Sequence, residues 1–302
     1  MQFKRIKRSI SGVLLLDKPY GISSNGALQQ AKRLYQAAKA GHTGNLDPIA
    51  TGLLPICFGE ATKFSQFLLD AGKTYQATFK LGKTTTTGDS EGEVTSNKVV
   101  DLSLGQVEQA LQQFVGPILQ VPPMHSAIKF QGKALYTYAR AGVEIERAAR
   151  PVTIYSLTLD HFAGDELAIT VACSKGTYIR VLAEDLGRVL GCGAYMQALR
   201  RTRIGSFDIG QTVTLEQLDG LDMEARDARL LPPDCLLEGL PKITLDRESA
   251  HYFRQGQAIW VPKQVHDGVV VLYDEVKTLV GIGEIADDGK IAPKRLVVEG
   301  TV

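Results

Sequence analysis

Residues 41–52 read Gly41-His-Thr-Gly-Asn-Leu-Asp-Pro-Ile-Ala-Thr-Gly52, and this stretch carries more structural information than any other part of the sequence. Pro48 biases the backbone of Asp47 away from helical geometry, and the glycines let the chain turn sharply around it. The stretch therefore predicts a loop that presents a carboxylate. Two roles fit such a group: it accepts hydrogen bonds from its own loop, or it takes part in a reaction.

The segments on either side of this loop predict a mixture of strands and helices. Residues 13–16 are apolar and run into the turn Asp17-Lys-Pro-Tyr-Gly21, and a helix that Ser24 or Asn25 caps is expected next. Residues 74–81 alternate between apolar and polar, which is typical of a half-buried strand. Ser103 and Gln106 form a capping box that predicts the start of another helix.

The later segments fix the expected domain organisation. Residues 179–189 have helical spacing of apolar side chains, whereas residues 118–151 lack periodicity and resemble a surface insertion. After residue 240, short apolar runs are broken by Asp-Gly turns at 267–268 and 288–289, which predicts a small β-rich domain. Because strands and helices mix without strict alternation, we expect an α+β fold whose sheet is mixed.

Composition describes an ordinary folded protein: 44% of the 302 residues are hydrophobic, 22% are charged, and the net charge is +1. A net charge close to zero argues against a nucleic-acid partner, because phosphates are bound by Lys and Arg. Clustered Lys and Arg residues can nevertheless form a positive face on a protein whose net charge is small. Basic residues cluster at 1–16, at 121–151 and at Arg200, Arg201 and Arg203. The four cysteines have no metal-ligand spacing, and no segment approaches a membrane span, so we expect reduced thiols, no bound metal and a cytoplasmic protein.

No competing catalytic motif stands out. The sequence has no GxSxG elbow, Walker loop or HExxH helix, which removes the main support for hydrolase, nucleotide-binding and zinc-protease functions. His42 is either a general base or an ordinary loop histidine, and Tyr75 is either a core tyrosine or a platform for a stacked base. Arg180 is either solvated or buried against a carboxylate.

Four separated segments together resemble the TruB family of tRNA pseudouridine-55 synthases of bacterial type. They are Asp17-Lys-Pro-Tyr-Gly-Ile-Ser23, residues 41–52, Lys73-Thr-Tyr75 with the following strand and the Asp89 loop, and Lys175-Gly-Thr-Tyr-Ile-Arg180. Residues 199–205 agree as well. The resemblance implies a pseudouridine synthase fold, with a central, largely antiparallel sheet flanked by helices and loops. The basic residues at the start of the sequence predict a basic tail at 1–10. The resemblance, which covers about residues 11–210 and extends more loosely beyond them, implies a catalytic domain at 11–240 with an RNA-gripping insertion at about 118–151. It also implies a C-terminal PUA-like RNA-binding domain at 241–302.

The same resemblance assigns roles to individual residues. It implies that Asp47 is the nucleophile, that Tyr75 packs on the target base and that Arg180 pairs with Asp47. Substrate-binding positions implied by the family are His42, Tyr75, Tyr178, Leu199 and Asp89, and RNA-binding positions are Lys63, Lys129 and Arg140. Asn45 departs from the family pattern, in which a small residue or Thr is expected, and this raises a question about the geometry of the loop.

The implied activity is the isomerisation of uridine 55 in the T-loop of tRNA, with the T-stem-loop as partner and a monomer as the expected state. Converting uridine to its C-glycoside transfers no electrons, so neither a metal nor a redox cofactor is expected. Arg180 beside Asp47 is expected to keep that carboxylate ionised at neutral pH. Two alternatives remain at this point: a noncatalytic RNA-binding or RNA-folding module, and a glycoside hydrolase, which needs a second carboxylate that the sequence does not identify.

Overall fold

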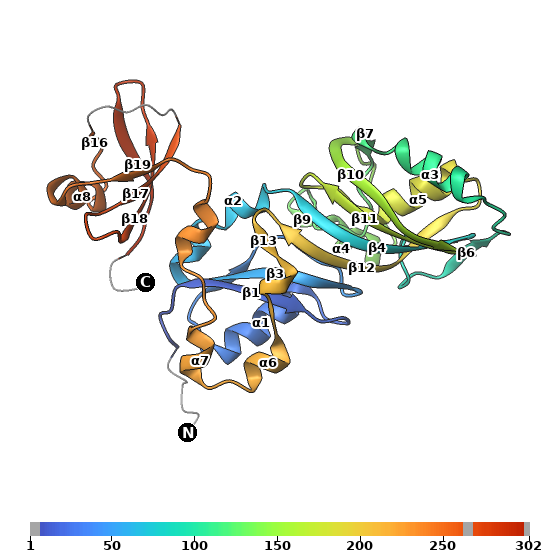
Figure 1. The fold of residues 1–302 in the computed structure, drawn as a ribbon, viewed down its shortest axis with the longest axis horizontal. Coiled ribbons are helices and arrows are strands. Elements are labelled where there is room, and N and C mark those ends of the chain that lie inside the picture. Colours follow the sequence, from blue (N-terminus) through green and yellow to red (C-terminus); the bar gives the residue numbers. More distant parts are fainter. Residues whose placement is uncertain (1–6, 262–267, 299–302) are drawn as a thin grey trace.

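The structure is a computed structural model, and it describes residues 7–261 and 268–298. Part of the predicted basic tail (residues 1–6) and Asp267 of the first predicted Asp-Gly turn lie outside the described residues. A long sheet crosses the molecule, and a smaller sheet domain formed by the C-terminal residues lies at one end of it (Figure 1). The α+β class predicted from the sequence is confirmed.

Ten strands make up the large sheet, and eight of them form a continuous path in the order β14-β1-β3-β12-β4-β11-β10-β7. Strand β2 pairs with β3, and β13 pairs with β12. Two pairings are parallel, β1 with β14 and β3 with β12, and the remaining ones are antiparallel. The bounds are β1 (Gly12–Lys18), β2 (Ala40–His42), β3 (Ala50–Phe58), β4 (Lys73–Leu81), β7 (Gly116–Gln120), β10 (Arg150–Ala163), β11 (Glu166–Cys173), β12 (Ala194–Ile204), β13 (Phe207–Asp208) and β14 (Val213–Thr214).

Helices cover this sheet at both ends. Helices α3 and α5 pack beside β10, β11 and β4, while α1 and α6 pack against β1 and β3 (Figure 1). The helices are α1 (Ser24–Leu34), α2 (Ser65–Leu69), α3 (Leu104–Gln112), α5 (Ile179–Val189), α6 (Leu215–Asp219) and α7 (Met223–Asp227), with short 3₁₀ turns η1 (Gly59–Lys63), η2 (Ile209–Gln211) and η3 (Pro233–Leu237). Burial of apolar side chains between helices and sheet is the main stabilising contribution to such a layered domain.

Local predictions from the sequence hold in most places. The capping box of Ser103 and Gln106 begins α3, and the alternating side chains of β4 bury Tyr75, Ala77, Phe79 and Leu81. Two predictions were wrong in detail. Ser23, and not Ser24 or Asn25, caps α1, with its hydroxyl accepting a hydrogen bond from the amide of Gly26. The stretch 41–52 is not loop throughout, because residues 40–42 and 50–52 belong to strands and only residues 43–49 connect them.

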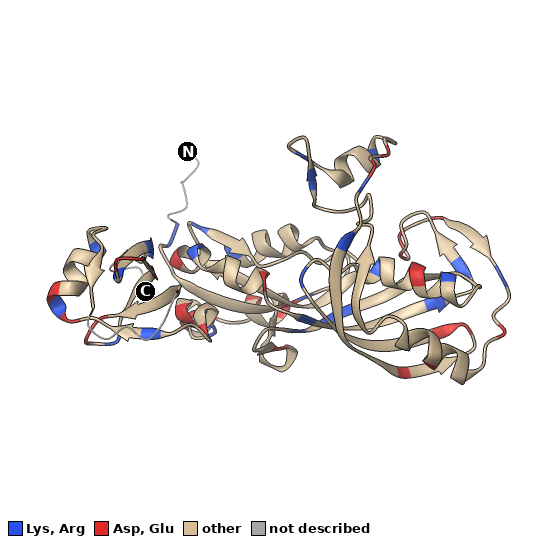
Figure 2. Cartoon of the chain, turned by 90° about the horizontal axis from the view of Figure 1, so that it is seen from above, with Lys and Arg blue, Asp and Glu red and all other residues tan. Residues whose placement is uncertain are grey.

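Residues 121–149 leave the sheet between β7 and β10, within the range of about 118–151 predicted for the insertion. This segment contains β8 (Lys129–Phe130), β9 (Lys133–Ala134) and α4 (Leu135–Arg140). Figure 2 shows it standing away from the body of the molecule, above the sheet. A second, smaller hairpin, β5 (Lys83–Thr85) with β6 (Val94–Asn97), carries the turn that contains Asp89.

The C-terminal residues fold into a five-stranded sheet of order β15-β17-β18-β19-β16 with one helix against it. Its elements are β15 (Lys242–Thr244), α8 (Arg247–Arg254), β16 (Ile259–Trp260), β17 (Val269–Tyr273), β18 (Leu279–Ile285) and β19 (Lys290–Leu296). One apolar cluster joins this sheet to the part of the chain that forms the large sheet, because Val271, Leu279 and Ile282 belong to the same cluster as Leu53 and Phe64. The junction between the two parts is therefore a continuous core.

Candidate active site

Polar groups of helix α1 and of the turn before it hold the loop of residues 43–49 in place. The Ser24 hydroxyl accepts a hydrogen bond from the amide of Leu46 (2.7 Å) and donates one to the Leu46 carbonyl (3.0 Å). The Gly21 amide donates to the carbonyl of Pro48 at 2.8 Å. These contacts flank Asp47 on both sides, so the loop offers its carboxylate from a fixed backbone.

Lys18 at the end of β1 completes this support. Its side chain is fully buried, and the ammonium donates to the carbonyls of Pro19 (2.8 Å), Ile22 (2.6 Å) and Pro48 (3.4 Å). Burial lowers the pKa of Lys18 to about 8 from its usual value of 10.5, while nearby Asp47 acts in the opposite direction. Lys18 therefore supplies positive charge and hydrogen bonds beneath the loop.

Arg180, the second residue of α5, brings two carboxylates together. Its Nε lies 3.0 Å from Oδ2 of Asp47, and its Nη1 lies 3.6 Å from Oδ2 of Asp89. The same guanidinium donates to the carbonyls of Thr87 (3.3 Å) and His125 (2.8 Å). The side chain of Arg180 therefore joins the Asp47 loop, the β5–β6 hairpin and the start of the insertion.

The two carboxylates differ in accessibility. The side chain of Asp89 is 3% exposed and accepts hydrogen bonds from the Thr87 hydroxyl and the Glu91 amide, whereas that of Asp47 is 37% exposed. Arg180 itself is only 6% exposed. Asp89 is thus fixed inside the structure, and Asp47 is the carboxylate that a substrate can reach.

The pKa of Asp47 is raised above its usual value, mainly because burial disfavours the charged form. Arg180 and Lys18 lower it, and Asp89 raises it further. The sequence-based expectation considered only Arg180, whose effect has the expected sign but is smaller than that of burial. A carboxylate in this setting is both reachable and less solvated than in water, and such perturbed groups cluster at functional sites.

Tyr75 and Leu199 form the apolar side of the site. They lie on the adjacent strands β4 and β12, are 8% and 9% exposed, and belong to the same core cluster as Leu46 and Ile49 of the loop. Tyr75 is thus a core residue with a small accessible part.

His42 and Tyr178 lie at the edges of the same region. Nδ1 of His42 is 3.1 Å from the carbonyl of Gly44, and burial lowers the pKa of the imidazole, so the neutral form is favoured. Tyr178 precedes α5, and its backbone exchanges two hydrogen bonds with the side chain of Gln120. The structure therefore brings together Asp47, Arg180 and Asp89 directly, with His42, Tyr75, Tyr178 and Leu199 on neighbouring elements.

The predicted RNA-binding residues occupy different settings. Lys129 and Arg140 are exposed on the insertion, and the guanidinium of Arg140 lies 5.4 Å from the ring centroid of Tyr136. Lys63 instead lies at the junction with the C-terminal sheet, where its ammonium is 2.6 Å from Oε2 of Glu60 and donates to the Leu296 carbonyl at 2.8 Å. Its contact with RNA stays a prediction.

One of the basic clusters seen in the sequence is not a surface patch. Arg200 forms a two-pronged ion pair with Asp17, Arg201 is 1% exposed, and only Arg203 projects mainly into solvent. Sequence reasoning also missed Ser24 and Lys18 as supports of the loop. Lys18 stands inside a stretch that the sequence singles out, but its burial follows from tertiary contacts that no local pattern encodes.

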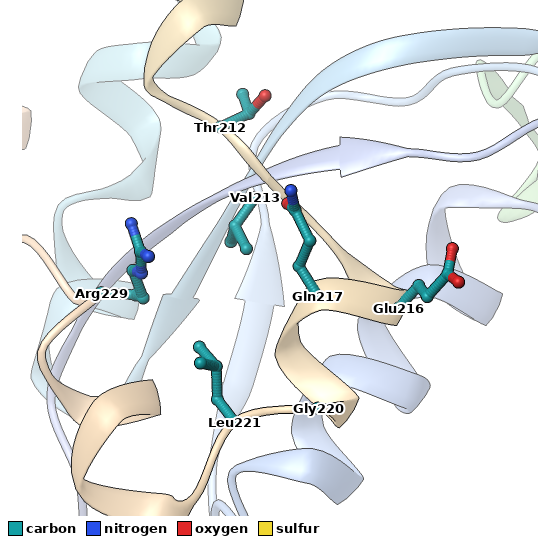
Figure 3. A pocket seen from close by; sticks show the side chains of 7 residues that line it. All are labelled: Thr212, Val213, Glu216, Gln217, Gly220, Leu221 and Arg229. Carbon is teal, nitrogen blue, oxygen red and sulfur yellow. The ribbon is translucent and has the colours of Figure 1, made fainter.

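Other features of the structure lie apart from the cluster of Asp47, Arg180 and Asp89. A cavity of about 480 Å³ is bordered by β14, α6 and Arg229, and none of the predicted site residues lines it (Figure 3). Among the described residues, no group of three or more His, Cys, Asp or Glu side chains is placed to hold a metal ion. The four cysteines are unpaired, and no helix of the described chain is long and apolar enough to cross a membrane.

Comparison with family models covers nearly the whole chain. Residues 32–179 match the model described as TruB family pseudouridylate synthase (N terminal domain), residues 180–238 match tRNA pseudouridylate synthase B C-terminal domain, and residues 241–297 match pseudouridine synthase II TruB, C-terminal. A protein named tRNA pseudouridine synthase B from Methylobacillus flagellatus is 57% identical over 297 residues, which is 98% of each chain. One with the same name from Dechloromonas aromatica is 54% identical over 98% of this chain and 99% of its own.

Solved structures agree with this match. A Cbf5–Nop10–Gar1 complex contains a chain that superposes with a TM-score of 0.73 at 28% identity, covering 95% of this chain and 84% of that one. A structure of an H/ACA RNP bound to a substrate RNA containing 2′-deoxyuridine gives a TM-score of 0.71 at 25% identity, with coverages of 95% and 85%. The similarity therefore extends over both the large sheet and the C-terminal domain.

Proposed function

The chain belongs to the TruB family of pseudouridylate synthases, and from this premise we propose that it isomerises uridine 55 in the T-loop of tRNA, with Asp47 as the nucleophile. Membership establishes the class of enzyme, an isomerase that forms pseudouridine. The tRNA substrate is supported by the names of its relatives, all of which span the full length of this chain within a few per cent. The position in the tRNA and the role of Asp47 are the finer parts of the proposal.

One observation carries the assignment of Asp47: it is the exposed member of a buried carboxylate–guanidinium–carboxylate cluster. The reaction breaks the N1–C1′ bond of uridine, turns the base and joins C5 to C1′; C5 loses a proton and N1 gains one, so atoms and electrons balance. A fixed carboxylate can assist by adding to C1′ or to C6 of the base, or by supporting a glycal route. All three routes require an ionised Asp47 near the ribose or base, which Arg180 and Lys18 favour.

The surroundings suit a nucleotide that has been turned out of its stack. Tyr75 and Leu199 give an apolar wall for the base, and the Asp89 hairpin borders it. We assign the grip on the RNA backbone to the insertion, where Lys129 and Arg140 are exposed, and a second RNA contact to the PUA-like C-terminal domain. An RNA loop lowers the cost of turning out the target, because its bases are already partly unstacked.

Asn45 fits this proposal despite its departure from the family pattern. Its side chain is exposed, and the loop uses its backbone carbonyl, which accepts a hydrogen bond from Arg201. The adjacent Gly44 has φ +85° and absorbs the unusual backbone conformation. The loop geometry therefore does not depend on a small side chain at position 45.

The hydrolase alternative needs a second carboxylate, and Asp89 supplies one near Asp47. However, Asp89 is buried and its hydrogen-bonding capacity is used by Thr87, Glu91 and Arg180, so it does not face a substrate as a general acid would. This arrangement, together with family membership, favours the isomerase.

The test is site-resolved mapping of pseudouridine in an unmodified tRNA transcript after incubation with the enzyme. A matched transcript with cytidine at position 55 serves as the control for other sites. Pseudouridine at position 55 of the first transcript and none in the second is the expected result. Modification at another uridine would contradict the assigned position, and tight tRNA binding without any pseudouridine would favour the noncatalytic RNA-binding or RNA-folding module.

A further inference from the structure

Arg201, in the second half of β12, contacts the loop that carries Asp47. It pairs in register with Tyr75 of β4 on one side and with Gly52 of β3 on the other, and it is 1% exposed. Its Nε donates to the carbonyl of Leu53 at 2.8 Å, and its Nη1 donates to the carbonyl of Asn45 at 3.4 Å. One side chain thus joins the beginning of the Asp47 loop to the strand that follows it.

The glycine at position 52 allows the backbones of β3 and β12 to approach closely beside Arg201. Gly52 has φ +103°, and a Cβ atom added there would lie 2.3 Å from the carbonyl oxygen of Arg201. No L side chain fits such an approach, so β3 and β12 can be this close only with glycine at position 52. The guanidinium also borders the loop at Gly44, where an added Cβ would be 3.7 Å from Nη1.

Arg201 differs from its neighbours in having no carboxylate partner among the described residues. Arg200 binds both oxygens of Asp17, and Arg180 lies between Asp47 and Asp89. The Nη2 donor of Arg201 has no hydrogen-bond partner in the described part of the chain. A buried cation without a counterion, and a buried donor without an acceptor, both oppose folding, so stability alone does not explain this residue.

The charge of Arg201 acts on the groups around the site. It opposes protonation of Lys18 and His42, and it favours the ionised form of the Tyr75 hydroxyl, while Tyr75 in turn stabilises the guanidinium. Arg201 therefore contacts the Asp47 loop through its Nη1 atom, which binds the Asn45 carbonyl, and pairs with Tyr75 across strands β12 and β4. In the proposed reaction, the Asp47 loop and Tyr75 must face the same nucleotide.

We propose that Arg201 is a positioning residue for the isomerisation: its side chain binds the carbonyls of Asn45 and Leu53, and its place beside Tyr75 in the sheet fixes the Asp47 loop relative to that ring. This inference rests on the proposed function. Arg201 touches neither substrate nor reacting atoms in this role. It acts by setting the distance between the carboxylate and the aromatic wall.

Arg201→Lys is the informative change, because lysine keeps the charge but cannot place two donors on separated carbonyls as the planar guanidinium does. Small misplacement of reacting groups costs on the order of 100-fold in rate. We expect the single-turnover rate of pseudouridine formation to fall by roughly this factor, with tRNA affinity within about threefold of wild type. Arg203→Lys is the matched control, since Arg203 lies two residues along the same strand and is 57% exposed on its side chain.

Two further readouts separate positioning from a purely structural role. Hydrogen–deuterium exchange of the peptide spanning residues 43–50 should be faster in Arg201→Lys and unchanged in Arg203→Lys. In a double-mutant cycle with Tyr75→Phe, the rate loss from Arg201→Lys should be smaller in the Phe background, because one of the two groups that Arg201 positions has already been altered.

The outcomes are distinguishable from failure of the proposed function. If wild type forms no pseudouridine, the proposed function fails, and the exchange measurement still decides whether Arg201 fixes the loop. If wild type is active and Arg201→Lys lowers the unfolding midpoint but leaves both the single-turnover rate and loop exchange unchanged, the positioning role is overturned. Full additivity with Tyr75→Phe would overturn the link to Tyr75.

Discussion

The candidate active-site cluster and the junction with the C-terminal sheet use the same kinds of charged residue in opposite ways. At the junction, Lys63 binds Glu60 and the Leu296 carbonyl, Glu60 also accepts a hydrogen bond from the Val298 amide, and Tyr273 donates to Asp234 at 2.8 Å. Apolar side chains surround these contacts. The polar groups there are matched, as expected where two parts of a chain are held together.

At the candidate active site the matching of charged and hydrogen-bonding groups is incomplete. Arg180 is buried between two carboxylates, Asp47 remains 37% exposed with a raised pKa, and Arg201 lies below with no acidic partner among the described residues. Such an arrangement costs stability and leaves one carboxylate available. The comparison teaches that an ion pair alone does not distinguish a structural contact from a candidate functional site, whereas an accessible carboxylate with a raised pKa in a buried cluster points to a candidate functional site.

The largest expected effect is the loss of activity in Asp47→Asn. The amide keeps the shape of the side chain but cannot act as a nucleophile, so single-turnover pseudouridine formation should fall by about 1,000-fold or more. Asn45→Thr is the control on the same loop, and because its side chain is exposed the rate should stay within about threefold. Normal turnover by Asp47→Asn would remove Asp47 from the mechanism.

Arg180→Met should damage both activity and stability. It leaves Asp89, 3% exposed, without its cation, and breaking a buried pair in this way costs on the order of 3 kcal/mol. Urea denaturation measures the change, and Arg188→Met, on the exposed face of the same helix, should shift stability by less than about 0.5 kcal/mol. A loss no larger than that of the control would show that the cluster is not energetically coupled.

Lys63→Met should have a smaller effect that is confined to the junction. Glu60 would keep the Val298 amide but lose its cation, and the Leu296 carbonyl would lose a donor, so we expect a loss of about 1–2 kcal/mol in the free energy of unfolding. The salt dependence of tRNA binding decides the predicted RNA contact. A phosphate contact would reduce the logarithmic slope by about one, as in a parallel Lys129→Met control, whereas an unchanged slope limits Lys63 to the junction.

Much of the fold could be predicted from local patterns. The capping box of α3, the alternation in β4 and the turn-rich β segments after residue 240 all encode their structure in neighbouring residues. The cap of α1 was misplaced because Ser23, Ser24 and Asn25 are consecutive and chemically similar. Strand β2 was missed because three residues within a glycine-rich stretch carry no pattern of their own, and pairing with β3 forms it.

The site was predictable only in outline. The glycine-rich loop identified Asp47 as a candidate, and the resemblance to the family implied that Arg180 pairs with it. Ser24, Lys18 and Arg201 were not found, because their roles depend on burial and on backbone carbonyls that come from distant strands. Arg200, Arg201 and Arg203 form one basic cluster in the sequence. In the structure Arg200 is ion-paired, Arg201 is buried and Arg203 is exposed.

The most direct test of the account measures the unfolding free energies of wild type and Asp47→Asn side by side as a function of pH. Because folding raises the pKa of Asp47 above its usual 3.8, the ionised carboxylate lowers the stability of wild type as pH rises through the folded pKa. Below that range the carboxylate is protonated and this cost disappears. The account therefore predicts that the stability of Asp47→Asn relative to wild type increases from about pH 4 to pH 7. A variant that instead becomes progressively less stable than wild type over this range would show that Asp47 serves the fold, and would contradict the account.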